Sequence, residues 1–503
     1  MRGDAGRRGG TTRQRAGWAA HAGARRAAVC AAVATALIAG LAACTTQPTV
    51  PIGPTSPVVT DPTSDLIGPL RVRGRDLVDA SGRTVLIHGL NSVAKSAPFL
   101  SSYDGTNLGD ADLDRVTRDG FNGIRLGVWP AAVSPQPGVI DHDYVAEVRA
   151  RVDQLAARGL WVVLDFHQDV FWGMPTWATT PEAAALSDQT PTGLDIGWAA
   201  AYASPRSTRQ WDDWWANTTV APGLGVVDAY GLGVAAIAAA TKDAPNVVGL
   251  ELINEPYPGG QILACALSDC PGLDAATARN NERITAAVRR VDPDVPVWWT
   301  AQALFPMYSD THLPAPSAAA GAVGSAFHTY CLYTDGGTPE EPPPAAVDLC
   351  EGAFTQGFNR AQQLADRWGA PALLTEFGAS ASPLNATIPA RIADERLLSW
   401  FHWASGRYPD VVESQIVRTS AQATAGTPLE QRFDPASGAY LLRFTPDHGI
   451  DAPTSIIVPG RAYPTGYATS VDGGRVTSAP NAGRLTVVAD PGADEVTVRV
   501  ARD

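Results

Sequence analysis

The chain has 503 residues, 45% of them hydrophobic and 18% charged, which is enough for one large folded domain and a smaller one. Acidic residues outnumber basic residues by 51 to 38, which gives a formal net charge of −13 at pH 7. This balance argues against nucleic acid as a partner and against docking on anionic lipid by charge.

Residues 1–43 are predicted to be a signal peptide. A basic stretch leads into an apolar run at 27–43 that is short for a membrane span. The run ends in Leu41-Ala42-Ala43-Cys44, which resembles a bacterial lipobox and would place a lipid on Cys44 after cleavage. Plain secretion is the alternative. We therefore expect an exported protein that is either a bacterial cell-surface lipoprotein or secreted.

The next two segments are predicted to be a tether and a large domain. Residues 44–65 are rich in proline and threonine, so we expect them to form an extended tether. Residues 66–407 contain eight strand-like segments that alternate with helical ones, which predicts a (β/α)8 TIM barrel. The expected strands are Thr84–Asn91, Phe121–Val128, Leu160–His167, Val247–Asn254, Pro296–Gln302, Val323–Tyr330, Pro371–Phe377 and Leu398–Trp403.

Residues 408–503 change to short alternating segments separated by Pro and Gly turns. This pattern predicts a small C-terminal all-β sandwich. It carries no obvious chemistry, so a structural cap on the barrel is favoured over a module that faces substrate or membrane.

Four cysteines follow the tether, namely Cys265, Cys270, Cys331 and Cys350. In an exported chain they are expected to form disulfides. Three pairings are possible, and Cys265–Cys270 with Cys331–Cys350 is the most economical because each pair falls within one loop. No histidine pair accompanies them as zinc ligands would require, and neither a metal nor another cofactor is predicted.

The long connection after the third strand is rich in tryptophan. Trp211, Trp214 and Trp215 have helical spacing, which favours packing in the core. Trp172 and Trp177 directly follow the strand end, where a cleft wall and core packing are about equally expected.

Polar and aromatic side chains gather at the expected carboxyl ends of six strands. They are Arg125, His167, Asp169, Asn254, Glu255, His328, Tyr330, Glu376 and Trp403. Barrel geometry brings all of these ends to one mouth, where parallel barrels build their active sites. Two carboxylates at such a mouth indicate a glycosidase, because glycoside hydrolysis uses one as acid or base and one as nucleophile.

The order of these motifs resembles glycoside hydrolase family 5, in the clan with its acid/base on strand four and its nucleophile on strand seven. Asn254-Glu255-Pro256 and Glu376-Phe377-Gly378 are the most specific pieces. Further segments resemble the endoglycoceramidase branch, namely His167–Phe171, Asn254–Gly259 with the cysteines after it, Ala425–Pro428 and Phe433–Pro435. The resemblance implies an enzyme that releases intact sugar from ceramide.

The pattern implies a retaining mechanism with Glu376 as nucleophile and Glu255 as acid/base. The negative charge of Glu376 favours a proton on Glu255 until Glu376 is esterified. Arg125 and Tyr330 are expected to hold Glu376, and Asn254 is expected to donate to the sugar 2-hydroxyl.

The remaining members of the site are expected to bind the sugar. His167 and His328 would complete a polar floor, and Trp403 would stack on the sugar ring. By resemblance, Lys95 and Asp169 would bind sugar hydroxyls, with a salt bridge as the alternative. Three other carboxylates are set aside as catalytic candidates, namely Glu251, Glu351 and Asp165, of which Asp165 could orient His167.

The predicted function is a retaining β-glycosidase that acts on glycosphingolipid at a membrane or micelle surface, with glucosyl or galactosyl preference undecided. One alternative is a family 5 endo-β-glucanase or mannanase that acts on polysaccharide. Another is a surface lipoprotein that binds glycan without turnover. An apolar groove beside the site would favour a glycolipid substrate. An open polar cleft would favour a polysaccharide substrate.

Overall fold

The computed structural model describes residues 68–503, apart from 101, 104, 105, 108, 190–200, 268, 269, 332–343, 380, 381 and 405–414. The predicted signal peptide, Cys44 and the tether lie outside the described residues. Within the described part, no helix is both long and apolar enough to cross a bilayer.

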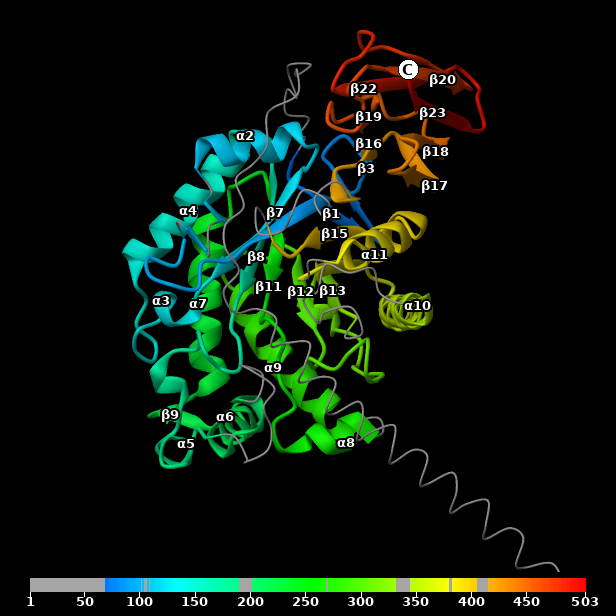
Figure 1. The fold of residues 1–503 in the computed structure, drawn as a ribbon. Helices are drawn as coiled ribbons and strands as arrows, with labels where there is room; N and C mark the ends of the chain where they lie inside the picture. Colours follow the sequence, from blue (N-terminus) through cyan, green and yellow to red (C-terminus); the bar gives the residue numbers. More distant parts are fainter. Residues whose placement is uncertain are drawn as a thin grey trace, which may run out of the picture.

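Eight parallel strands close into a barrel, as predicted (Figure 1). Nearly every residue in them is buried, because a barrel strand packs on side chains inside and on helices outside. In barrel order the strands are β4 His88–Ser92, β7 Gly123–Val128, β8 Trp161–Phe166, β11 Val247–Glu251, β12 Val297–Thr300, β13 Val323–Thr329, β14 Ala372–Phe377 and β15 Ser399–His402.

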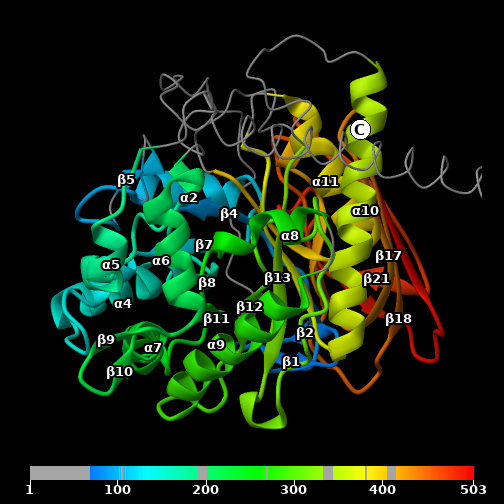
Figure 2. The ribbon, with the colours of Figure 1, turned by 90° about the horizontal axis from the view of Figure 1, so that it is seen from below.

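Helices surround this barrel in both views (Figures 1 and 2). Local signals fix their ends; for example, the Asp141 carboxylate accepts hydrogen bonds from the backbone of Asp143 and Tyr144 at the start of α4. The helices are α2 Asp110–Arg118, α3 Pro130–Val133, α4 His142–Ala156, α5 Pro181–Ala184, α6 Pro205–Trp215, α7 Val226–Thr241, α8 Ile262–Leu267, α9 Pro271–Arg289, α10 Pro344–Trp368 and α11 Pro383–Glu395. Short hairpins add β5 Ser102–Tyr103, β6 Thr106–Asn107, β9 Thr219–Ala221 and β10 Leu224–Gly225.

The tryptophans after β8 divide between core and surface. Trp211, Trp214 and Trp215 on α6 are buried in the main core, which confirms their predicted packing. Trp177 packs against the same core and donates its indole N–H to the Ser134 carbonyl at 2.8 Å. Trp172, by contrast, is 55% exposed.

The first predicted barrel strand, Thr84–Asn91, is wrong as a single element. Thr84 and Val85 form β3, which pairs with β16 of the C-terminal domain, and the barrel strand β4 begins only at His88. Val85 and Ile87 nevertheless share one buried cluster with barrel side chains such as Val163 and Phe401. The apolar run therefore continues while the hydrogen-bonding partner changes, and hydrophobicity alone does not reveal that change.

The N-terminal strands complete the first sheet of the β-sandwich. That sheet runs β1 Arg71–Arg73, β2 Asp76–Val78, β3 Thr84–Val85, β16 Ser420–Thr424, β19 Thr454–Ile457, β22 Arg484–Ala489 and β21 Gly474–Val476. The second sheet runs β17 Gly426–Asp434, β18 Ala439–Pro446, β23 Val496–Arg502 and β20 Tyr467–Asp472. Side chains of both sheets, including Leu442 and Leu485, share one core, which confirms the predicted sandwich.

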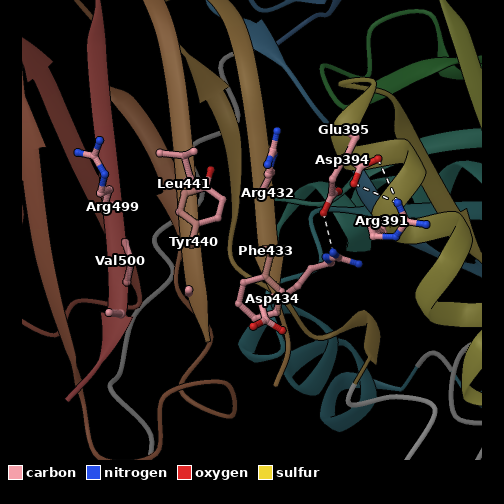
Figure 3. A pocket seen from close by; sticks show the side chains of 13 residues that line it. Arg391, Asp394, Glu395, Arg432, Phe433, Asp434, Tyr440, Leu441, Arg499 and Val500 are labelled. Atoms are coloured by element: carbon pink, nitrogen blue, oxygen red, sulfur yellow. Dashed lines mark hydrogen bonds and ion pairs between the residues drawn. The ribbon is translucent and has the colours of Figure 1, made fainter. Parts of the chain in front are cut away.

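The sandwich packs on the barrel through α11, which contacts β17 (Figures 1 and 2). A cavity of about 500 Å³ lies between α11 and the second sheet (Figure 3). Beside it, Arg418 Nη2 lies 2.7 Å from Asp394 Oδ2, and both side chains are buried. His88 Nε2, from the first barrel strand, lies 3.3 Å from the other oxygen of Asp394. This buried joint favours a structural role for the domain.

Candidate active site

Glu255 and Glu376 come together at the barrel mouth. One carboxylate oxygen of each and a ring nitrogen of His328 all lie within 4.8 Å of one another. Retaining glycosidases hold their two carboxyl groups about 5–5.5 Å apart, whereas inverting ones leave about 6.5–9.5 Å for a water. The spacing therefore fits direct attack by one carboxylate. The same three groups could also hold a cation, so the expected absence of a metal stays a prediction.

The backbone at Glu255 adopts an uncommon conformation. Its φ is +38°, in the left-handed region that residues other than glycine seldom occupy. Gln168 supports this turn, because its side-chain amide donates to the carbonyls of Asn254 at 2.7 Å and of Glu255 at 3.2 Å. Gln168 was not predicted as a site residue, although it lies next to His167 in the sequence.

Arg125 is fully buried beneath the pair and contacts three carboxylates. Nη1 donates to Glu376 at 2.6 Å, Nε to Glu251 at 2.7 Å, and Nη2 lies 2.9 Å from Asp165. Nη2 also donates to the Asn254 side chain at 2.9 Å. Burial alone would lower the pKa of Arg125, but the three carboxylates outweigh it and raise that pKa, so this cation is permanent.

Both oxygens of Glu376 are held. Arg125 donates to Oε1, and the Tyr330 hydroxyl donates to Oε2 at 2.7 Å. Gly378 follows with φ +101°, and a Cβ there would lie 2.4 Å from His402 Nε2. Only glycine fits this turn, which explains the glycine of the Glu-Phe-Gly motif.

His328 contacts both catalytic candidates. Its Nδ1 lies 2.7 Å from Glu255 Oε1 and 3.6 Å from Glu376 Oε2, and its Nε2 lies 3.8 Å from Glu251 Oε1. Burial opposes a charge on the ring, but the three carboxylates raise the pKa of His328 to about 10. An imidazolium therefore adjoins Glu255 at neutral pH.

A second chain of charges runs along the end of β8. His167 Nδ1 lies 2.7 Å from Asp165 Oδ2, so Asp165 does orient His167. His167 Nε2 lies 3.7 Å from Asp169, whose Oδ2 lies 2.7 Å from Lys95 Nζ. Despite burial, Asp165 and Asp169 raise the pKa of His167 to about 9. Lys95 and Asp169 thus form the salt bridge named as the alternative, and their contact with sugar hydroxyls stays a prediction.

An aromatic group lines this side of the site. Trp403 is 3% exposed, stacks on His167 at 5.5 Å between ring centroids and lies 5.0 Å from Lys95 Nζ. Trp129 stacks on the same histidine, and the exposed Trp172 packs edge-on against Trp129 at 4.9 Å. The predicted sugar-stacking role of Trp403 stays a prediction, and Trp172 adds a solvent-facing ring.

Asn254 and Glu251 complete the region around Arg125. Asn254 accepts from Arg125 and donates to the Gln168 carbonyl at 3.0 Å, so its predicted bond to a sugar hydroxyl would use the remaining amide hydrogen. Glu251, set aside from the sequence, is fully buried against Arg125. Its place four residues before Glu255 gave no signal that it enters the site. Glu351 lies elsewhere and pairs with Arg391 on the surface.

Two disulfides close loops that follow barrel strands. Cys265 is bonded to Cys270 between α8 and α9, and Cys331 at the end of β13 is bonded to Cys350 on α10. This is the pairing that the sequence marked as most economical.

The cellulase model of glycosyl hydrolase family 5 matches residues 78–408, and the glycoside hydrolase family 5 C-terminal domain model matches residues 418–500. The chain belongs to glycoside hydrolase family 5. This family 5 chain is 36% identical to endoglycoceramidase I of Rhodococcus hoagii (strain 103S) over 449 residues, which cover 86% of this chain and 88% of that protein.

Two further comparisons agree. An endoglycoceramidase of Cyanea nozakii is 25% identical over 453 residues, covering 79% of this chain and 85% of that protein. The solved structure of endo-glycoceramidase II from Rhodococcus sp. in complex with ganglioside GM3 aligns with a TM-score of 0.73 and 26% identity, covering 85% of this chain and 99% of that chain. The chain is therefore a glycoside hydrolase of this family.

Proposed function

We propose that this family 5 enzyme hydrolyses the bond between sugar and ceramide in glycosphingolipids with retention of configuration, releasing the intact glycan. The observation that carries the proposal is the Glu255–Glu376 pair, with oxygens within 4.8 Å, in a chain 36% identical to an endoglycoceramidase. The glycolipid GM3 in the related Rhodococcus sp. structure supports the same substrate class.

In the first step, a Glu376 oxygen forms a bond to the anomeric carbon as the bond to the ceramide oxygen breaks. The electron pair goes to that oxygen, which takes the proton of Glu255 and leaves as the ceramide alcohol. Arg125 and Tyr330, each on one Glu376 oxygen, orient the attacking group. The product of this step is a glycosyl ester of Glu376.

In the second step, a water attacks the same carbon and gives its proton to Glu255. The ester bond breaks and Glu376 returns as a carboxylate. Two inversions at one carbon restore the β configuration. We assign sugar binding to five groups linked by contacts beside the two carboxylates, namely Asn254, Lys95, Asp169, His167 and Trp403.

We further propose that the enzyme works at a membrane or micelle surface. Leu263 and Leu267 on α8 are 67% and 59% exposed, and Leu349 on α10 is 53% exposed. Both helices lie in connections that leave carboxyl ends of barrel strands, and each is tied by a disulfide. Such apolar side chains suit contact with lipid. The negative net charge argues against attraction to anionic headgroups. Export, with Cys44 lipidated on the cell surface, fits this site of action.

The test is mass spectrometry of the products from defined glucosyl-, galactosyl- and lactosylceramides in detergent. We expect free ceramide, with intact lactose from lactosylceramide, and the galactosyl and glucosyl substrates would reveal the linkage preference. Glu376→Gln should lower the rate by roughly 10⁴-fold or more, because it removes the nucleophile and keeps the shape. Release from a glucan or mannan and from none of the ceramides would favour a polysaccharide hydrolase. Binding without turnover in any assay would favour a glycan-binding protein.

A further inference from the structure

We propose that Glu251 is a positioning residue that acts on both catalytic carboxylates, on Glu376 through Arg125 and on Glu255 through His328. The inference rests on the roles proposed above for Glu255 and Glu376. Glu251 is fully buried behind the pair, so it acts without touching substrate.

The link to the nucleophile runs through one guanidinium. Glu251 Oε2 accepts from Arg125 Nε at 2.7 Å, while Nη1 of the same arginine donates to Glu376 at 2.6 Å. A guanidinium is planar and rigid, so the carboxylate that holds its Nε edge sets the direction of Nη1. Glu251 thereby fixes where Arg125 places Glu376.

The link to the acid/base runs through the imidazolium. Glu251 Oε1 is held by the hydroxyls of Thr375 at 3.2 Å and Thr300 at 3.4 Å, and it lies 3.8 Å from His328 Nε2. The opposite ring nitrogen of His328 lies 2.7 Å from Glu255. Glu251, Glu255, Glu376 and the ring edge of Tyr330 are the groups that face this histidine among the described residues.

The charges of the whole cluster give Glu251 a second effect. Linked ion pairs join five carboxylates to four cations, which are Glu251, Glu255, Glu376, Asp165 and Asp169 with Arg125, His328, His167 and Lys95. Glu251 Oε1 lies 3.8 Å from His328 Nε2, so removing the charge of Glu251 weakens the hold of His328 on its proton.

The decisive variant is Glu251→Gln, which keeps the shape and removes the charge. With lactosylceramide in detergent, we expect kcat to fall about 10²-fold while KM changes little, because the displaced groups are catalytic and Glu251 makes no substrate contact. The alkaline limb of the kcat/KM profile should move to lower pH by about one unit, since removing a nearby negative charge weakens proton binding. The His328 signal in an NMR titration should move in the same direction.

Asp394→Asn is a matched control. Asp394 is also a buried carboxylate held by an arginine and a histidine, Arg418 and His88, but it lies at the joint between barrel and sandwich (Figure 3). Its neutralisation should lower the melting temperature and leave the pH profile and the His328 titration unchanged. Equal profiles for the two variants would reduce Glu251 to a structural role and overturn the proposal.

Glu251→Asp keeps the test decisive if Glu251→Gln does not fold. It retains the charge on a shorter side chain, so it should keep the alkaline limb and the His328 titration while lowering kcat. A wild-type kcat in a folded Glu251→Asp or Glu251→Gln variant would contradict the proposal. If the wild type does not hydrolyse lactosylceramide, the function proposed above fails, and the substrate-free His328 titration still decides whether Glu251 controls that charge.

Discussion

Arg125 and Glu376 are 251 residues apart in the sequence and meet across 2.6 Å. Arg125 is fully buried and also holds Glu251 and Asp165, so the cation has a fixed direction before substrate arrives. Preorganised charge of this kind costs no reorganisation during the reaction. In the proposed reaction, this arrangement orients Glu376 toward the anomeric carbon, while Glu255 gives its proton to the leaving oxygen.

Replacing Arg125 with lysine should damage both stability and activity. A lysine ammonium on a flexible side chain cannot bind all three carboxylates that the planar guanidinium binds at once. Leaving buried carboxylates unpaired typically costs about 3–5 kcal/mol, so the free energy of unfolding in urea should fall by that order. Arg391→Lys is the control, because Arg391 is 39% exposed and pairs with Glu351 and Glu395 on the surface. That control should stay within about 0.5 kcal/mol of wild type. Similar losses for the two variants would contradict the central role of Arg125.

Glu255→Ala should lose the proton that the ceramide oxygen needs. Loss of a general acid costs about 10²–10⁴-fold, and an aliphatic leaving group such as ceramide should lie at the upper end. Azide needs no base to attack, so adding it should restore the second step for a substrate with a good aryl leaving group. The expected product, identified by NMR, is a β-glycosyl azide. An α-glycosyl azide, or an unchanged rate without azide, would assign the acid/base role elsewhere.

Stability should decline on the alkaline side. His328 and His167 have pKa values of about 10 and about 9 in the folded protein against an ordinary 6.5, because neighbouring carboxylates outweigh their burial. Their ion pairs therefore stabilise the fold fully below pH 6.5, and this contribution is lost as the pH rises through 9 to 10. Urea unfolding at intervals from pH 6 upward measures the loss. His328→Gln should flatten the curve, and a curve as steep as that of wild type would remove His328 from this account.

Stability should also decline in acid through Glu251. Although burial opposes ionisation, Arg125 and His328 lower the pKa of Glu251 to about 2 from an ordinary 4.5. Its contribution is present above pH 4.5 and is lost as the pH falls toward 2. In Glu251→Gln this part of the acid transition, followed by circular dichroism, should be absent.

The exposed leucines should matter only when the substrate lies in a lipid surface. Burying a leucine side chain gains about 1.5–3 kcal/mol, so Leu263→Ser with Leu267→Ser should slow hydrolysis of glycolipid in neutral vesicles by about tenfold or more. Hydrolysis of a soluble aryl glycoside should be unchanged. A matched change at Leu429, which is 47% exposed on β17 of the sandwich, serves as the control. Equal effects at both places would contradict a lipid-facing α8.

Much of the site could be predicted from the sequence, because a barrel brings side chains from successive strands together at one end. Arg125, His328 and Glu376 lie within buried strands, and Glu255 follows one. The closed sheet brings these strands together around one site. Family motifs at Glu255 and Glu376 then indicated retaining hydrolysis of a glycosidic bond.

The features that the sequence did not predict depend on tertiary contacts, which a pattern of residue types along the chain does not show. Glu251 lies in an apolar strand, and only the three-dimensional contact with Arg125 reveals its place. Thr84 and Val85 look like the start of a barrel strand because they are apolar or β-branched and buried, yet they pair with the sandwich. For Trp172 the sequence favoured neither packing in the core nor a place in the cleft wall. Its exposure follows from tertiary packing.

Time-resolved proton NMR of lactosylceramide hydrolysis tests the central claim most directly, because it reports the bond broken and the configuration together. The account predicts that β-lactose is released first, beside free ceramide, and then equilibrates to the α form. Initial release of α-lactose would contradict the paired carboxylates as a retaining site, and release of galactose with glucosylceramide left behind would contradict cleavage at the ceramide bond.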